Sequence, residues 1–296
     1  MRECKWQSDL FPYMPEKIRL PLWDIDPLRA QSLEEIRLRI RRPVQLIGSD
    51  FEQMLPQILP DEALFGSLLE NLSEHSAYIY ERERREGFFT LPGGYRVGIC
   101  GRRGAGEDMN CISGFNIRIA REWKGCADAL MASLVTEAGS LQSTLLLSPP
   151  GVGKTTMLRD IARQFSEGGR AGVKKVAIAD ERSEIAGCRL GVPTLDVGAR
   201  TDVMDAYPKA KAIPMLLRSM SPQLIVTDEI GGAEDTAALR EAGRCGVIVI
   251  ASAHAPNAAA ARARSELAPL FEEKLFPCLI ELYRENSTVR FRVAGA

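Results

Sequence analysis

The sequence predicts an α/β domain built on a mostly parallel sheet, preceded by a smaller α+β domain. In residues 144–165 a glycine-rich loop joins an apolar run to a helical run. From about residue 126 onward, short apolar runs alternate with helical segments, the pattern of a parallel sheet covered on both faces. Before residue 125, apolar and basic side chains alternate with a period of two, which indicates half-buried strands. We therefore expect two domains, residues 1–125 and 126–296.

Composition places the chain among globular proteins of the cytoplasm. Its 296 residues are 45% hydrophobic and 26% charged, and 38 basic residues nearly balance 39 acidic ones, so nothing global indicates a nucleic-acid partner. The seven cysteines are odd in number and scattered without a Cys-x-x-Cys spacing, which favours reduced thiols over a disulfide framework or a zinc site. The longest apolar stretch, near residues 247–251, is too short to span a bilayer, so any membrane association needs partners.

The first domain shows strand and turn signals in order. In residues 33–44, Ile36, Leu38 and Ile40 alternate with three arginines, which predicts a strand with a basic outer face. A helix is expected around residues 61–75. The run 87–99 contains Pro-Gly-Gly between two β-like stretches and predicts a hairpin, and the alternating residues 116–121 predict the last strand.

The second domain alternates strands and helices. Its predicted strands are residues 144–147, 175–179, 224–227 and 247–251, and its predicted helices lie near residues 128–137, 155–165, 208–220, 235–242 and 258–261. Parallel strands collect their carboxyl ends at one edge of the sheet, where ligands bind. Each motif described next follows one of these strands.

The loop after the first of these strands is a phosphate-binding loop, and it predicts ATP or GTP binding. It consists of Ser148, Pro149, Pro150, Gly151, Val152, Gly153, Lys154, Thr155 and Thr156. The glycines let the backbone approach phosphates, Lys154 reaches the β- and γ-phosphates, and the Thr155 hydroxyl holds Mg²⁺. Ser148 stands where the motif usually has its first glycine. No guanine-reading Asn-Lys-x-Asp or Thr-Lys-x-Asp string is present, which favours ATP.

Two acids end the strand at residues 224–227. Asp228 is expected to orient the magnesium shell and Glu229 to position or deprotonate the attacking water. A pair of carboxylates at the tip of a buried strand is costly unless a cation meets it. The alternative is a helix cap, since Gly231 and Gly232 follow and Asp235 could itself cap the next helix.

Other polar residues share the same edge. His254 ends another strand and could sense the γ-phosphate and relay its presence to residues 257–264, although a lone histidine there could be an ordinary loop residue. The strand 175–179 runs into an acidic cluster that includes Asp180, Glu181 and Glu184, with a solvated turn as the alternative.

An arginine acting on the γ-phosphate of a neighbouring subunit is a frequent requirement of ring ATPases. Arg118 and Arg121 are the first candidates. The next candidates are Arg96, Arg102, Arg103, Arg200 and Arg218. For any one of these arginines, a surface salt bridge is the more common role.

Several strings together resemble the stage III sporulation protein AA family across nearly the whole chain. These strings are residues 35–39, 91–98, 116–121, 180–185, 196–203 and 220–222. The resemblance implies a RecA-like P-loop NTPase domain, similar to that of the hexameric ATPases of type II secretion and type IV pili. In those enzymes an acidic box, a glutamate and a histidine box carry the nucleotide chemistry, and they correspond here to residues 180–184, Glu229 and His254.

The resemblance further implies the protein's setting. It implies an Mg²⁺-dependent ATPase in the mother-cell cytoplasm, a hexameric ring held at the membrane by membrane proteins of a sporulation channel assembly, with arginines such as Arg118 and Arg121 donated by the N-terminal domain. The secretion enzymes commonly carry glycine where this chain has Asp228. Two alternatives stay open: a nucleic-acid-associated RecA-like ATPase, and a scaffold that binds nucleotide without hydrolysing it.

Overall fold

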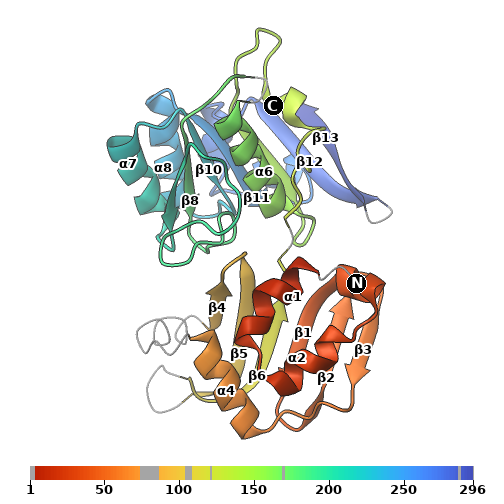
Figure 1. Ribbon diagram of the computed structural model, residues 1–296. Helices are drawn as coiled ribbons and strands as arrows, with labels where there is room; N and C mark the ends of the chain where they lie inside the picture. Colours follow the sequence, from red (N-terminus) through yellow and green to blue (C-terminus); the bar gives the residue numbers. More distant parts are fainter. Residues whose placement is uncertain are drawn as a thin grey trace. The chain divides into compact units, whose positions relative to one another are not determined.

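The computed structural model describes residues 4–73, 87–103, 109–120, 122–168, 171–285 and 288–295 (Figure 1). The chain forms two compact units, Met1–Arg121 and Glu122–Ala296. In the described residues, no helix is both long and apolar enough to cross a bilayer.

The first unit is an antiparallel sheet with helices over one face (Figure 1). The strand order is β3-β2-β1-β6-β5-β4. The strands are β1 (Leu33–Arg39), β2 (Arg42–Gly48), β3 (Glu52–Leu55), β4 (Phe88–Leu91), β5 (Tyr95–Arg103) and β6 (Met109–Arg118). The helices are α1 (Lys5–Leu10), the 3-10 helix η1 (Phe11–Tyr13), α2 (Glu16–Trp23), α3 (Pro27–Ser32) and α4 (Glu62–Leu72). Apolar residues of α1, α2 and α4 pack with those of the strands in one core.

Most sequence signals in this unit mark real elements. The Pro-Gly-Gly turn joins β4 to β5, with Gly93 and Gly94 at φ of 84° and 76°. The alternating run at residues 33–44 is not one strand, however: β1 ends at Arg39, and the chain turns at Ile40 and Arg41, the latter at φ 57°, and returns as β2. The period of two continues across this tight turn, so periodicity alone could not show it.

The second unit contains a seven-stranded sheet in the order β13-β12-β7-β11-β10-β8-β9. Its strands are β7 (Thr144–Ser148), β8 (Val176–Asp180), β9 (Thr201–Asp205), β10 (Leu224–Thr227), β11 (Ile248–His254), β12 (Cys278–Glu285) and β13 (Thr288–Gly295). Every neighbouring pair is parallel except β12 with β13. The mostly parallel sheet predicted from the sequence is confirmed.

Helices cover both faces of this sheet (Figure 1). They are η2 (Met131–Leu134), α6 (Lys154–Glu167), α7 (Lys209–Met220), α8 (Ala233–Arg244), α9 (Ala258–Arg262) and α10 (Ala268–Glu272). Successive residues of a strand point to opposite faces. Leu146 therefore packs with α6, whereas Leu145 and Leu147 pack with α7 and α8. Burial on both faces explains why these strands are continuous apolar runs in the sequence.

One predicted helix of this unit is wrong. Residues 128–137 form turns and the short η2, in which Leu130 and Ser133 donate backbone hydrogen bonds to residues three positions earlier. The segment ends at Val135, which forms an antiparallel bridge with Leu141. Buried Leu130, Met131 and Leu134 gave the helical spacing, but strand-like pairing at Val135 ends the helix after one turn.

Candidate functional site

The predicted phosphate loop connects β7 to α6. Ser148 is the last residue of β7 and is fully buried, and α6 begins at Lys154. Gly151 and Gly153 have φ of 76° and 114°, a region that side chains disfavour, so glycine is needed at both positions. Ser148 has no positive φ, and it therefore replaces the first glycine of the motif without backbone strain.

Lys154 lies inside its own loop. Its side chain is buried, and its Nζ lies 3.1 Å from the carbonyl oxygens of Ser148 and Pro149, 3.0 Å from Ser148 Oγ and 3.0 Å from His254 Nδ1. Burial lowers the pKa of Lys154, and the charges of Glu229 and Asp228 oppose that effect. An ammonium has only three protons for these four acceptors, so the four contacts cannot all be full hydrogen bonds at the same time.

His254 joins this lysine to Glu229. It ends β11, whose register places it beside Ser148 on β7. Because the Lys154 ammonium can only donate, His254 Nδ1 accepts, and Nε2–H donates to Glu229 Oε1 at 2.8 Å. The two contacts thus fix the orientation of the imidazole, with Nδ1 toward Lys154 and Nε2 toward Glu229.

Glu229 is held at several points after β10. Its backbone N–H donates to Ser252 Oγ at 3.1 Å, and its φ of 40° turns the chain away from the strand direction. The carboxylate accepts from His254 at Oε1 and pairs with Arg182 at Oε2. Partial burial raises the pKa of Glu229, but the His254 hydrogen bond and the Arg182 charge outweigh it, so the net pKa is lowered. The carboxylate is therefore ionised and oriented.

Asp228 is buried without a partner. Only 1% of it is exposed, and neither carboxylate oxygen has a hydrogen bond within the described residues. Burial, followed by the charge of Asp180, raises its pKa to about 7, while Lys209 acts in the opposite direction. Two unpartnered carboxylate oxygens are a destabilising arrangement that a cation would relieve.

These oxygens fit a magnesium ion that is shared with phosphates. Mg²⁺ prefers oxygen ligands and is usually held by one or two protein groups together with phosphates and waters. Within the described residues no cluster of three or more acidic, histidine or cysteine side chains could hold a metal by itself. Asp228 and the hydroxyl of Thr155, at the start of α6, are the groups suited to this role.

The acidic residues that follow β8 have different structural roles. Asp180 is fully buried and accepts hydrogen bonds from the backbone N–H groups of Glu184, Ile185 and Ala186 at 2.8 to 3.0 Å. Burial raises the pKa of Asp180, and these hydrogen bonds oppose the rise. Glu181 forms a 3.2 Å ion pair with Lys209. Asp180 thus shapes its loop and keeps no oxygen aimed at a ligand.

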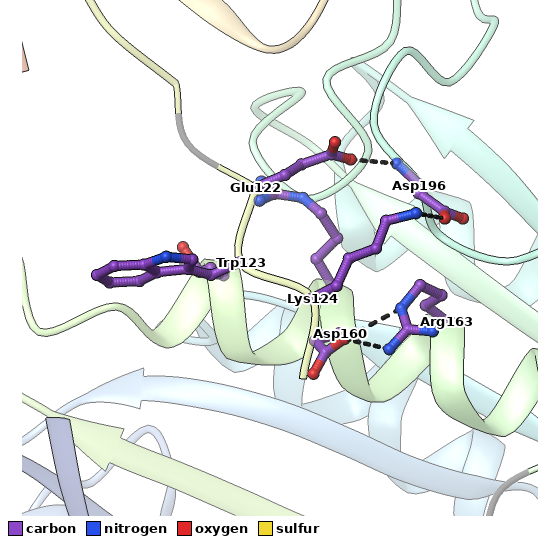
Figure 2. Close-up of a pocket in the computed structure, with 8 residues that line it drawn as sticks. Glu122, Trp123, Lys124, Asp160, Arg163 and Asp196 are labelled. Atoms are coloured by element: carbon purple, nitrogen blue, oxygen red, sulfur yellow. Dashed lines mark hydrogen bonds and ion pairs between the residues drawn. The ribbon is translucent and has the colours of Figure 1, made fainter. Parts of the chain in front are cut away.

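The far side of α6 is also tied to this loop. Arg159 donates to the carbonyl oxygens of Glu184 and Ile185. Beside it, Figure 2 shows the segment Glu122–Lys124 lying on α6: Lys124 pairs with Asp196, whose backbone N–H donates to Glu122 at 2.6 Å. The phosphate-loop helix and the acidic loop therefore form one connected block.

The arginines predicted from the sequence lie in different parts of the fold. Arg118 ends β6 of the first unit, in register with Glu35 and Arg96, and Arg121 lies outside the described residues. Arg96 stacks over Phe88 at 3.7 Å, and Arg200 donates to the Ser166 carbonyl at the end of α6.

Sequence reasoning missed four residues around the site: Arg182, Lys209, Ser252 and Arg284. Lys209 is buried with its Nζ 3.5 Å from the Glu229 carbonyl oxygen, and Arg284 donates to the Gly151 carbonyl oxygen at 3.1 Å. A lysine at the start of a helix and an arginine on a distant strand carry no local signal. Arg182 lies within residues 180–184, where only the acidic residues were predicted to be functional.

A parallel sheet covered on both faces, with a phosphate loop after one strand and acids and a histidine after its neighbours, defines a RecA-like P-loop NTPase fold. Residues 8–294 match the family described as "Sporulation stage III, protein AA". The chain belongs to that family.

Individual relatives agree with this assignment. Stage III sporulation protein AA of Bacillus subtilis (strain 168) is 41% identical over 284 residues, which cover 94% of this chain and 91% of the relative. Two solved structures share the fold. The Legionella pneumophila ATPase DotB has a TM-score of 0.60 at 15% identity, covering 95% of this chain and 81% of its own. The pilus retraction motor PilT with bound ADP has a TM-score of 0.54 at 13% identity, covering 92% and 83%.

Proposed function

We propose that this protein is an Mg²⁺-dependent ATPase motor that energises a channel or secretion assembly between mother cell and forespore. The observation that carries the proposal is the contact chain Lys154–His254–Glu229 beside the buried, unpartnered Asp228. The sporulation family and the fold shared with the ATPase DotB and the pilus retraction motor PilT support it.

Each residue has a role that its surroundings favour. The backbone N–H groups at the start of α6 and Lys154 bind the β- and γ-phosphates. Glu229, ionised and fixed by two partners, orients or deprotonates the attacking water, and His254 couples it to the lysine. Thr155 and Asp228 would hold Mg²⁺, which would supply positive charge to the phosphate oxygens.

Phosphate release from ATP by the full chain, measured with and without Mg²⁺, tests the activity. Glu229→Gln keeps the shape of the side chain but removes the base, so we expect turnover to fall about 100-fold or more with nucleotide binding retained. Lys154→Ala should instead weaken ADP binding at least about tenfold. Glu234→Gln, an exposed glutamate on the next helix, is the matched control. If Glu229→Gln hydrolyses ATP as fast as the parent, the assignment of Glu229 fails.

We further propose a hexameric ring in which Arg118 or Arg121 reaches a neighbouring subunit's nucleotide. Mixing tests this arrangement. Chains with Arg118→Ala or Arg121→Ala retain Glu229, and chains with Glu229→Gln retain both arginines, so one mixed interface contains a complete site. Recovery of activity on mixing supports action between subunits, and no recovery for either arginine refutes it.

Association with sporulation membrane proteins is the remaining part of the proposal. A fluorescent fusion in sporulating cells should lie at the mother-cell side of the forespore membrane. It should become diffuse when the membrane proteins of the assembly are deleted. A fusion that stays at the membrane without them contradicts attachment through these partners.

A further inference from the structure

We propose that Arg182 is a catalytic arginine that acts within its own chain, exchanging Glu229 for the terminal phosphate of the bound nucleotide. This inference rests on the proposed function and adds a residue to its site. The guanidinium pairs with Glu229 through Nη1, and 54% of the side chain is exposed. In the described part of the chain, Nη1 is the only guanidinium nitrogen of Arg182 with a protein partner.

The loop that carries Arg182 is anchored on both sides. Before it, Asp180 ends β8 and turns inward to the backbone N–H groups that follow the arginine. After it, Ser183 adopts a φ of 54° and its hydroxyl donates to Asp205 on the adjacent β9. Arg159 of the phosphate-loop helix also binds the carbonyl oxygen of Glu184. The backbone is therefore fixed while the arginine side chain extends to Glu229.

Arg182 is the last member of a line of contacts across the carboxyl edge of the sheet. Lys154 Nζ lies 3.0 Å from His254, His254 lies 2.8 Å from Glu229, and Glu229 contacts Arg182. A terminal phosphate held by Lys154 lies at one end of this line, with the water-positioning carboxylate between it and the arginine. The proposed exchange therefore requires the Arg182 side chain to leave Glu229 and extend past this carboxylate toward the phosphate, and its 54% exposure leaves it room to move.

Energetics favour this exchange. The arginine side of this ion pair is 54% exposed, and solvent screens such a pair strongly, so exchanging the partner of Arg182 costs little. A phosphate carries more charge than a carboxylate and accepts two parallel N–H bonds from a guanidinium fork. Negative charge that develops on the phosphate during hydrolysis strengthens this interaction further. The pairing with Glu229 also keeps the arginine near the site before the exchange.

The position differs from that of the N-terminal arginines. Arg118 belongs to the first unit, whereas Arg182 and Glu229 belong to the same unit and are in direct contact. An arginine that completes the site within one chain gives no reason of its own for a ring. The proposed ring rests on the family resemblance instead.

Binding of ADP and of ADP with Mg²⁺ and aluminium fluoride, a mimic of the transferring phosphate, tests the inference on the full chain. Arg182→Ala should bind ADP within about threefold of the parent but lose about 100-fold in affinity for the aluminium fluoride complex, and turnover should fall similarly. Arg182→Lys should restore part of this loss, because it keeps the charge without the fork. Arg244→Ala, which removes another exposed arginine paired with a glutamate, is the control.

The outcomes separate the two proposals. If the parent binds ADP no more tightly with aluminium fluoride and releases no phosphate, the proposed ATPase activity fails and this inference fails with it. In the other case, the parent binds ADP more tightly with aluminium fluoride and releases phosphate. If Arg182→Ala then behaves like the parent, or hydrolyses ATP faster, only the inference about Arg182 is overturned. Equal loss of ADP and aluminium fluoride binding assigns Arg182 a purely structural role and also overturns it.

Discussion

Replacing Asp228 by asparagine should stabilise the second unit, and by an amount that grows with pH. The carboxyl is 1% exposed, lacks a hydrogen-bond partner in the described residues, and has a pKa raised from 3.8 to about 7. Ionising it in the native state therefore costs about 4 kcal/mol, since a difference of one pKa unit between native and unfolded states is worth about 1.4 kcal/mol.

The number of protons bound in the native and unfolded states decides whether native stability rises or falls with pH. Between pH 3.8 and about 7 the unfolded chain has lost the Asp228 proton while the native protein retains it, so native stability falls as pH rises. The loss is complete above about pH 7. Asparagine cannot ionise, and any packing cost of its amide is independent of pH. The advantage of Asp228→Asn over the parent should therefore increase by about 2–3 kcal/mol between pH 5 and pH 8.

Hydrogen exchange of the β10 amides, corrected for intrinsic rates and measured without metal or nucleotide, reports the opening free energy of this unit alone. This choice matters because a chain of two units need not unfold in one step. Asp202→Asn, which changes an exposed carboxylate on β9, is the control. A difference between parent and Asp228→Asn that stays constant from pH 5 to pH 8 would refute the reasoning. Saturating Mg²⁺ and ADP should stabilise the parent more than the variant.

Two further predictions concern the interior of the same unit. Gly198→Ala should lower the opening free energy of this unit by about 3 kcal/mol or more, because φ is 88° and the new Cβ would lie 2.6 Å from Ser166 Cβ. Gly191→Ala, at φ 80° with no atom close to the new Cβ, should lower it by only about 1 kcal/mol in the same exchange measurement. Equal losses for the two variants would contradict the steric argument. Burial, and then the charge of Asp205, raises the pKa of Cys188 to about 12, so iodoacetamide at pH 8 should label exposed Cys245 and leave Cys188 unmodified until the protein unfolds; rapid labelling of native Cys188 would contradict its burial.

The second unit was largely predictable because its signals are local. Strands buried on both faces are continuous apolar runs, and the glycine loop and the helices between them follow from short-range rules. The hairpin of β12 and β13 was missed although its second strand alternates Val289, Phe291 and Val293 with two arginines. β9 gives a weaker sequence signal for a strand, because Thr201–Asp205 is short, rich in polar residues and at the edge of the sheet.

Part of the site could be predicted because parallel strands end at one edge. That rule places Lys154, Asp228, Glu229 and His254 together before any contact is known. It cannot say which member of a charged run faces inward. Among residues 180–184, only the fold shows that Asp180 satisfies backbone groups and that the arginine two positions later meets Glu229.

Under the proposed function, His254 would make phosphate binding and water positioning interdependent. Its Nδ1 lies against Lys154 and its Nε2 against Glu229, so one imidazole ring connects the two. If the phosphates of a bound nucleotide accepted the hydrogen bonds of the Lys154 ammonium, Nδ1 would lose its donor, and the ring would be free to rotate or to move away from Glu229. Either change alters the hydrogen bond at Glu229 Oε1 and leaves Arg182 as the other side-chain partner of this carboxylate in the described residues. A phosphate that binds to Lys154 and also attracts Arg182 would then act on Glu229 from both sides, which links substrate binding to release of the carboxylate for its water.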